Sequence, residues 1–113
     1  GRLYLLRCGG APAGTVALRR IDASRCELKR LYVHPDFRGH GYARRLVETV
    51  LSDAAAIGYR QVLLDTFPFL TGAIALYHDC GFREVPSYNG SPMPELIYMA
   101  LELPAPGPSV PGT

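Results

Sequence analysis

Apolar and polar positions in the first third of the chain follow the pattern of β-strands. Residues 3–8 and 15–21 are rich in leucine, valine and isoleucine, and residues 9–14 between them carry glycine and proline. Because glycine and proline favour turns, we predict an antiparallel hairpin. Residues 26–33 are a third apolar segment that does not keep one strict alternation, so we predict a third strand that contains a β-bulge.

The hydrophobic period changes after residue 41. Apolar residues recur every three or four positions up to residue 57, which predicts an amphipathic helix, and Gly58 is placed to end it. Residues 62–64 are a short apolar run of the kind found in strands that are covered on both faces. The third strand, the helix and this fourth strand therefore form a parallel unit, whose crossover is right-handed.

Shorter elements follow the fourth strand. Residues 72–80 have the spacing of a second amphipathic helix, with Gly81 as its stop, and residues 83–85 and 95–103 are predicted strands. The predicted fold class is therefore α/β with a mixed (α+β) sheet, in which antiparallel strands precede a central parallel β-α-β unit.

One domain is predicted for the chain. Its 113 residues fall within the usual size of a single domain, and 48% apolar with 19% charged residues is a globular composition. We place this domain at residues 1–103. Residues 104–113 contain four prolines and two glycines, which predicts a disordered tail. The chain starts with Gly1 rather than methionine, from which we predict that an N-terminal part is missing.

Charge and cysteine content limit the partners and the compartment. Twelve basic and ten acidic residues leave a formal net charge of +2, so neither nucleic acid nor a membrane is predicted as a partner. A nucleic-acid-binding domain that uses the scattered arginines and seven tyrosines is the weaker alternative. The three cysteines are odd in number and far apart, which indicates reduced thiols and a cytoplasmic protein.

The loop between the third strand and the first helix carries the candidate chemistry. A loop that leaves a strand and enters a helix presents unpaired backbone N–H groups at the positive end of the helix dipole, where an anion is stabilised. Glycine lets that backbone approach an anion closely, and an arginine adds a charge-assisted hydrogen bond. The predicted anion-binding residues are Arg38, Gly39, His40, Gly41, Tyr42 and Ala43.

Other phosphate-binding loops fit this segment less well. A Walker loop needs Gly-Lys-Ser or Gly-Lys-Thr, which the sequence lacks, and a dinucleotide-binding loop needs a third glycine at the position of Arg44. Asp65, at the end of the fourth strand, could replace the ribose-binding acid of such a loop, but antiparallel strands ahead of the loop disfavour that fold. A glycine-rich turn that serves only tight packing stays open as an alternative.

Two motifs give the chain a family resemblance. Residues 28–43 resemble the acetyl-CoA motif of the GNAT superfamily of N-acetyltransferases, whose core pattern Arg/Gln-x-x-Gly-x-Gly/Ala is matched by Arg38, Gly41 and Ala43. Residues 73–82 resemble the second signature of that family, in which Leu-Tyr is followed a few residues later by Gly-Phe. The two motifs occur in the family's order.

The resemblance implies an N-acetyltransferase that moves the acetyl group of acetyl-CoA to a primary amine by direct transfer. It implies a splay between the third and fourth strands, into which pantetheine inserts and bonds the backbone around Leu31, Tyr32 and Val33. Tyr77 matches the family tyrosine that protonates the departing CoA thiolate. Glu27 matches a glutamate often found at this place in the family, so it is the candidate general base, directly or through water. From the residues alone, Tyr77 could be a core tyrosine, and Glu27 an exposed strand residue paired with an arginine or lysine.

The sequence departs from the family at the acceptor side. The family usually has a first strand and one or two helices ahead of the hairpin, and these wall the acceptor pocket, but the chain shows none of them. The site for the small-molecule or peptide amine is then wide, completed by a second subunit in a homodimer, or incomplete. A second hypothesis is therefore a catalytically inactive module that binds CoA or another protein. No metal is implied, since His34, His40 and His78 lack the spacing of a metal site.

Overall fold

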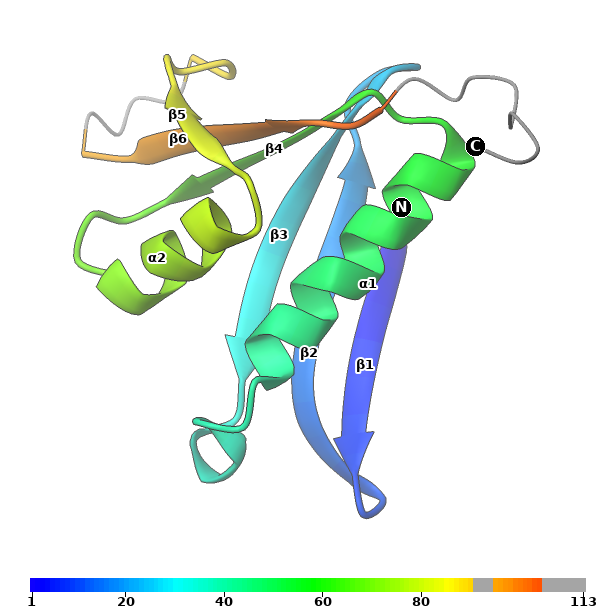
Figure 1. The fold of residues 1–113 in the computed structure, drawn as a ribbon, viewed down its shortest axis with the longest axis vertical. Coiled ribbons are helices and arrows are strands. Elements are labelled where there is room, and N and C mark those ends of the chain that lie inside the picture. The colour runs from blue at the N-terminus through cyan, green and yellow to red at the C-terminus, as the bar shows by residue number, and fades with distance from the viewer. Residues whose placement is uncertain (91–94, 105–113) are drawn as a thin grey trace, which may run out of the picture.

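Six strands form one sheet in the computed structural model of the chain, which describes residues 1–90 and 95–104 (Figure 1). In chain order the elements are β1 (Arg2–Cys8), β2 (Ala11–Arg20), β3 (Arg25–Val33), the 3-10 helix η1 (Pro35–Phe37), α1 (Tyr42–Ile57), β4 (Gln61–Thr66), α2 (Thr71–Asp79), β5 (Arg83–Val85) and β6 (Ile97–Glu102). The strand order is β1-β2-β3-β4-β6-β5, and β3 with β4 is the one parallel pair among the described strands. The predicted mixed sheet is confirmed.

The ends of the predicted elements agree with the structure to within a few residues, with one clear exception. The turn of the first hairpin is only Gly9 and Gly10, both with positive φ (59° and 85°), so β2 already begins at Ala11. The broader turn predicted at residues 9–14 is wrong because Pro12 lies opposite Arg7 beside an irregularity in the β1–β2 register, where a missing N–H is tolerated. All but the first residue of the predicted tail, residues 104–113, lies outside the described residues.

The bulge predicted in the third strand is confirmed. Thr15 pairs with Tyr32 and Ala17 pairs with Lys29, so two residues of β3 face one residue of β2. One of these two residues, Arg30, has a φ of 57°, an unusual conformation for a residue with a side chain. The bulge brings Lys29 and Tyr32 onto the same face of the sheet and bends β3 just before it reaches the candidate loop.

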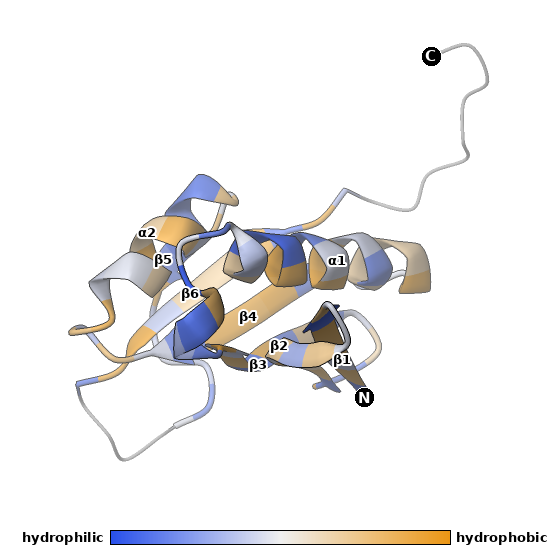
Figure 2. Ribbon diagram, turned by 90° about the horizontal axis from the view of Figure 1, so that it is seen from below, coloured by the Kyte–Doolittle hydropathy of each residue, from blue (hydrophilic) through white to orange (hydrophobic). Residues whose placement is uncertain are grey.

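Both helices lie on one face of the sheet, as Figure 2 shows. The buried face of α1 has the predicted three- and four-residue spacing and packs on β2, β3 and β1. The core of this face contains Val16, Leu18, Cys26, Leu28, Leu46, Val47, Val50, Ala54, Val62, Leu64 and Met99. Among the described residues no helix covers the other face, where Leu3 and Leu5 are 74% and 47% exposed.

The parallel pairing between β3 and β4 is short. It joins Arg25 with Gln61, Cys26 with Val62, and Glu27 with Leu63. Beyond these three pairs the strands diverge, which Figure 1 shows as two arrows that separate toward their carboxyl ends. β3 stays paired with β2, and β4 stays paired with β6, so the sheet opens in its middle.

Within the described residues, no helix has the length and the apolar run needed to cross a membrane.

Gly14 provides a test of the packing between β2, β3 and α1. A Cβ atom there would lie 2.8 Å from the Tyr32 carbonyl oxygen and 3.0 Å from Leu46 Cδ1. Because the backbone of a paired strand cannot move away easily, we expect Gly14→Ala to lower the free energy of unfolding by about 1–3 kcal/mol. Urea denaturation followed by circular dichroism measures this change.

The matched control is Gly72→Ala in α2, where an added Cβ meets no heavy atom within 4 Å. Alanine favours a helix over glycine by about 0.5–1 kcal/mol, so this variant should be as stable as the parent or slightly more stable. Equal losses of stability in both variants would contradict the packing argument.

Candidate active site

The open middle of the sheet contains a cavity of about 400 Å³. It lies between the diverging parts of β3 and β4 and reaches Leu70, which caps the start of α2, and Tyr77 in the last turn of that helix. The lining residues are Leu28, Lys29, Arg30, Leu31, Asp65, Thr66, Phe67, Leu70 and Tyr77. Backbone N–H and C=O groups of β3 that face β4 have no strand partner here, because the pairing of the two strands ends at Glu27. An extended ligand can therefore bond this edge of β3 in place of a strand.

Tyr77 enters this cavity from α2. The residue is 5% exposed, and its ring packs edge-on against Phe82 with the ring centroids 5.7 Å apart. Burial, with a smaller contribution from Cys80, raises the pKa of Tyr77 to about 12. The phenol therefore keeps its proton at neutral pH and can donate it.

Glu27 lies on the opposite face of the sheet from Tyr77. Its neighbours Cys26 and Leu28 belong to the core under the helices, and side chains alternate along a strand, so the carboxylate points away from the helices. It is 2% exposed, which makes the alternative of an exposed strand glutamate wrong. The predicted cationic partners are present, since Oε1 lies 3.3 Å from an Arg19 nitrogen and 3.6 Å from Lys29 Nζ.

Tyr88 is a neighbour of Glu27 that the sequence did not predict. Its hydroxyl donates a short hydrogen bond to Glu27 Oε2, across 61 positions in the chain. Burial and this bond to a carboxylate both raise the pKa of Tyr88. The sequence held no signal that this tyrosine would cover the carboxylate, because the contact depends on how β5 and β6 join the sheet.

The predicted anion-binding loop forms a second, smaller hollow next to the cavity. Gly39 and Gly41 have φ values of 83° and 77°, and a Cβ at either position would meet nothing within 4 Å. Glycine is needed there for the backbone conformation, and the space beside it is open to a ligand. The hollow measures about 110 Å³ and is lined by Val33, Phe37, Arg38, Gly39, Gly41, Tyr42 and Ala43.

The amino end of α1 opens onto this loop. Gly41 is the N-cap, and within the described residues no side chain caps this end. The first intrahelical bond runs from Arg45 N to the Gly41 carbonyl, which leaves the N–H groups of the first turn for an external acceptor. The positive end of the helix dipole adds to the attraction for an anion.

Arg38 also holds the loop in place. Its Nε donates to the Val33 carbonyl oxygen at 2.9 Å, and its guanidinium carbon lies 5.7 Å from the centre of the Tyr32 ring. Leu31 lines the cavity and Val33, two residues later, lines the loop hollow. The end of β3 therefore connects the two hollows. The exposed ring of His40 lies beside Tyr42, with the centroids 5.7 Å apart, so His40 contributes to the loop surface.

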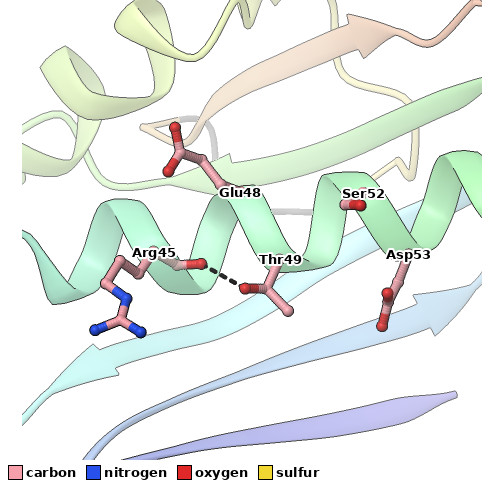
Figure 3. A pocket seen from close by; sticks show the side chains of 5 residues that line it. All are labelled: Arg45, Glu48, Thr49, Ser52 and Asp53. Atoms are coloured by element: carbon pink, nitrogen blue, oxygen red, sulfur yellow. Dashed lines mark hydrogen bonds between the residues drawn. The ribbon is translucent and has the colours of Figure 1, made fainter.

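A further hollow of about 350 Å³ lies on the outer side of α1 (Figure 3). Its lining residues all belong to α1 and are Arg45, Glu48, Thr49, Ser52 and Asp53. Thr49 Oγ1 donates to the Arg45 carbonyl oxygen at 2.8 Å, and Asp53 accepts a 2.8 Å bond from the Tyr4 hydroxyl. Both bonds hold α1 itself or fix it to β1, and none of the lining residues belongs to the predicted site.

His34 and His40 make separate local contacts. His34 Nδ1 accepts a hydrogen bond from Asp36 N at 3.2 Å, and His40 contacts Tyr42. Within residues 1–90 and 95–104, no group of three or more histidine, cysteine, aspartate or glutamate side chains is arranged to hold a metal ion.

Comparison with known proteins agrees with this geometry. The model of the acetyltransferase (GNAT) family matches residues 1–82. The chain belongs to the GNAT acetyltransferase family. The matched part contains the glycine loop, the splay between β3 and β4, and α2 with Tyr77.

Curated relatives of the chain are named N-acetyltransferases. An uncharacterized N-acetyltransferase of Schizosaccharomyces pombe is 36% identical over 95 residues, which cover 83% of this chain and 58% of the relative. The uncharacterized N-acetyltransferase YjgM of Escherichia coli is 35% identical over 72 residues, which cover 64% of this chain and 43% of the relative. This GNAT chain thus spans about half the length of these relatives.

Solved GNAT structures have the same fold. A GNAT family acetyltransferase from Elizabethkingia anophelis, with acetyl-CoA bound, is 25% identical with a TM-score of 0.79, and the match covers 89% of this chain and 75% of that one. The ribosomal-protein-S18-alanine N-acetyltransferase of Escherichia coli is 24% identical with a TM-score of 0.80, covering 96% and 73%. The mixed sheet with its open middle is therefore the GNAT fold.

Proposed function

We propose that this GNAT chain transfers the acetyl group of acetyl-CoA directly to a primary amine. The observation that carries the proposal is the cavity between β3 and β4, which has a protonated, buried tyrosine on one side and a buried carboxylate on the other face of the sheet. Transfer of an acetyl group to an amine needs one group to donate a proton and another to accept one.

The residues of the loop and of β3 fit acetyl-CoA. Gly39, Gly41 and the uncapped first turn of α1 supply backbone N–H groups and open space for a pyrophosphate. The edge of β3 around Leu31, Tyr32 and Val33, which β4 leaves without a strand partner, offers backbone groups to the amide-containing pantetheine arm, and the Val33 carbonyl oxygen also accepts from Arg38 Nε. The two hollows meet along this strand, so one ligand can occupy both.

Acetyl-CoA supplies an activated thioester when it is bound. Tyr77 is the general acid in this proposal, and the proton of its hydroxyl moves to the sulfur that leaves as the new amide bond forms. The amide nitrogen releases its second proton in the same reaction, and this proton, passed through solvent, restores the Tyr77 phenol. The apolar surroundings of Tyr77 keep this proton in place until a stronger base, the thiolate, develops beside it.

Glu27 is the general base in this proposal. An amine with a reference pKa near 10.4 is neutral in only about one molecule in 2,500 at pH 7, so removing its proton costs roughly 4.6 kcal/mol. The carboxylate stands at the last paired position of β3, where the cavity begins, and Arg19 and Lys29 place positive charge 3.3 Å and 3.6 Å from its Oε1. An ionised carboxylate can accept the proton.

Two measurements test the function. Calorimetric titration should show that the chain binds acetyl-CoA, and a thiol-detection assay with a panel of primary amines should show CoA release that depends on the amine. Absence of acetyl-CoA binding would contradict the assignment of the cofactor. Binding without turnover for any amine would instead favour a CoA-binding module without catalysis.

Gly41→Ala should weaken acetyl-CoA binding. Alanine at a φ of 77° is strained by about 1–2 kcal/mol, and its Cβ would occupy the space in which the loop meets the pyrophosphate. Gly58→Ala is the matched control, because Gly58 caps the other end of α1 with a φ of 109° and open space around it. Both variants should lose similar stability in urea, and only Gly41→Ala should also lose affinity in calorimetry. Equal affinities would remove the loop from the binding site.

Tyr77→Phe should lower kcat about 10²- to 10⁴-fold with little change in the KM for acetyl-CoA, because it removes the proton donor and keeps the packed ring. Since the pKa of Tyr77 is about 12, the parent enzyme should keep its acid protonated, and its rate should not fall, up to about pH 10. Tyr59→Phe, at a half-buried position of the core, is the control that should keep the parent rate. An unchanged kcat in Tyr77→Phe refutes the acid assignment.

Glu27→Gln should lower kcat/KM for the amine at neutral pH and recover toward the parent value as the pH approaches the pKa of the amine, where no base is needed. The fold should tolerate the change, because the side chains of Arg19 and Lys29 are 67% and 36% exposed and stay solvated without the carboxylate. Stopped assays across this pH range measure the ratio. A loss of equal size at every pH would indicate a structural role for Glu27.

A further inference from the structure

The hydroxyl of Tyr98 is buried without a hydrogen-bond partner among the described residues. Tyr98 lies on β6 and is 7% exposed. Buried polar atoms in folded proteins almost always have a partner, so a bound group or a water molecule beside this hydroxyl would complete its hydrogen bonding. Met99, the next residue, belongs to the core under the helices, which places Tyr98 on the same sheet face as Glu27.

Two other oxygen-bearing side chains gather around Tyr98 on this face. Asp65 is its direct partner in the β4–β6 ladder, and residues paired in this way hold their side chains next to each other. The Tyr88 ring packs edge-on against the Tyr98 ring, with the centroids 5.4 Å apart. The charge of Asp65 contributes to the raised pKa of Tyr88, as expected for groups that are close in space.

This cluster borders the cavity between β3 and β4, because Asp65 is one of the residues that line it. The cluster is also connected to the candidate base, since Tyr88 donates its hydroxyl proton to Glu27 Oε2. The nearby cations Arg19 and Lys29 bond Glu27, and Asp65 has no ion-pair partner in the described part of the chain. The cluster therefore presents a carboxylate and two phenol oxygens without a described ion pair, although Lys29 and Arg30 line the same cavity as Asp65.

An ammonium group matches these oxygens in charge and in number. A protonated primary amine has three N–H donors and no acceptor, so it needs three acceptors to leave water. The Asp65 carboxylate supplies the opposite charge, the Tyr98 oxygen has no other partner among the described residues, and the Tyr88 oxygen keeps its lone pairs when its proton bonds Glu27. A hydroxyl or a quaternary ammonium would leave part of this set unpaired.

We propose that Asp65, Tyr88 and Tyr98 form the binding site for the ammonium group of the acceptor, which enters from the sheet face opposite α1 and α2. The inference rests on the proposed function, and it names the acceptor as a primary amine that binds in its protonated form. One proton then leaves the ammonium nitrogen for Tyr88 Oη as the Tyr88 Oη proton moves to Glu27 Oε2. The amine is left neutral, Tyr88 is again a phenol, and Glu27 carries the proton.

The test uses n-butylammonium as the probe, titrated at constant ionic strength and neutral pH into the chain with ¹³C-labelled tyrosine rings. We expect saturable NMR shifts of the Tyr88 and Tyr98 rings. Butyltrimethylammonium and n-butanol are the matched controls, because the first lacks N–H donors and the second lacks the charge. Neither control should shift these rings in a saturable way.

Asp65→Asn and Tyr98→Phe should each weaken butylammonium binding by about tenfold or more, the loss expected for one hydrogen bond to a charged group. Tyr59→Phe, outside the cluster, should bind as the parent does. Tyr98→Phe should melt at the same temperature as the parent or higher, because it removes a buried group that has no described partner. A merely structural hydroxyl would show the reverse, a lower melting temperature with unchanged binding of the probe.

The inference is overturned by ring shifts that are absent, that occur equally with the two control compounds, or that survive Asp65→Asn and Tyr98→Phe; the Tyr98 hydroxyl would then hold only a buried water. Titration with acetyl-CoA in the same samples separates this outcome from failure of the proposed function. If acetyl-CoA binds and butylammonium does not, the ammonium site is wrong and the transferase proposal stands. If butylammonium binds and acetyl-CoA does not, the transferase proposal is wrong and the ammonium site stands.

Discussion

The early end of the parallel pairing between β3 and β4 is the constraint on which the candidate site depends. Only three residue pairs, up to Glu27 and Leu63, join the two strands. The bulge at Arg30 bends β3, which remains paired with β2, while β4 remains paired with β6 and diverges from β3. A sheet that paired along its full length would have neither the cavity nor free backbone groups in its middle, and Tyr77 would pack against a closed surface.

The open sheet separates two kinds of chemistry onto its two faces. On the helix side, Tyr77 lies among apolar side chains, and this environment keeps the phenol protonated by disfavouring its anion. On the other side, Glu27 is buried as well, but two cations and a tyrosine hydroxyl surround its carboxylate. Such partners offset the cost of burying a carboxylate. A buried phenol and a buried carboxylate thus lie on opposite sides of the open sheet, because Tyr77 reaches the cavity from α2 and Glu27 points away from the helices.

The two glycines that cap α1 share a positive φ but have different effects on the helix. Gly58 has positive φ where the helix stops, and its N–H bonds the carbonyls of Ala54 and Ala55, which completes the helix internally. Gly41 has positive φ where the helix starts, and no described side chain caps the N–H groups that follow it. At Gly58 the protein alone satisfies the end of the helix. At Gly41 backbone N–H donors stay available at the positive end of the helix dipole, next to the end of β3.

Local patterns in the sequence determined most of the elements and the family. The spacing of Leu46, Val47 and Val50 defines the buried face of α1, the two glycines mark the loop, and the irregular pattern of residues 26–33 predicts the bulge, because each of these signals lies within one short segment. The tertiary structure decided the length of the first hairpin turn, the burial of Glu27 and its bond to Tyr88. It also decided the position of Tyr98 beside Asp65. Apart from the hairpin turn, these features depend on strand register between segments far apart in the chain, and a one-residue change of register would turn each side chain to the other face.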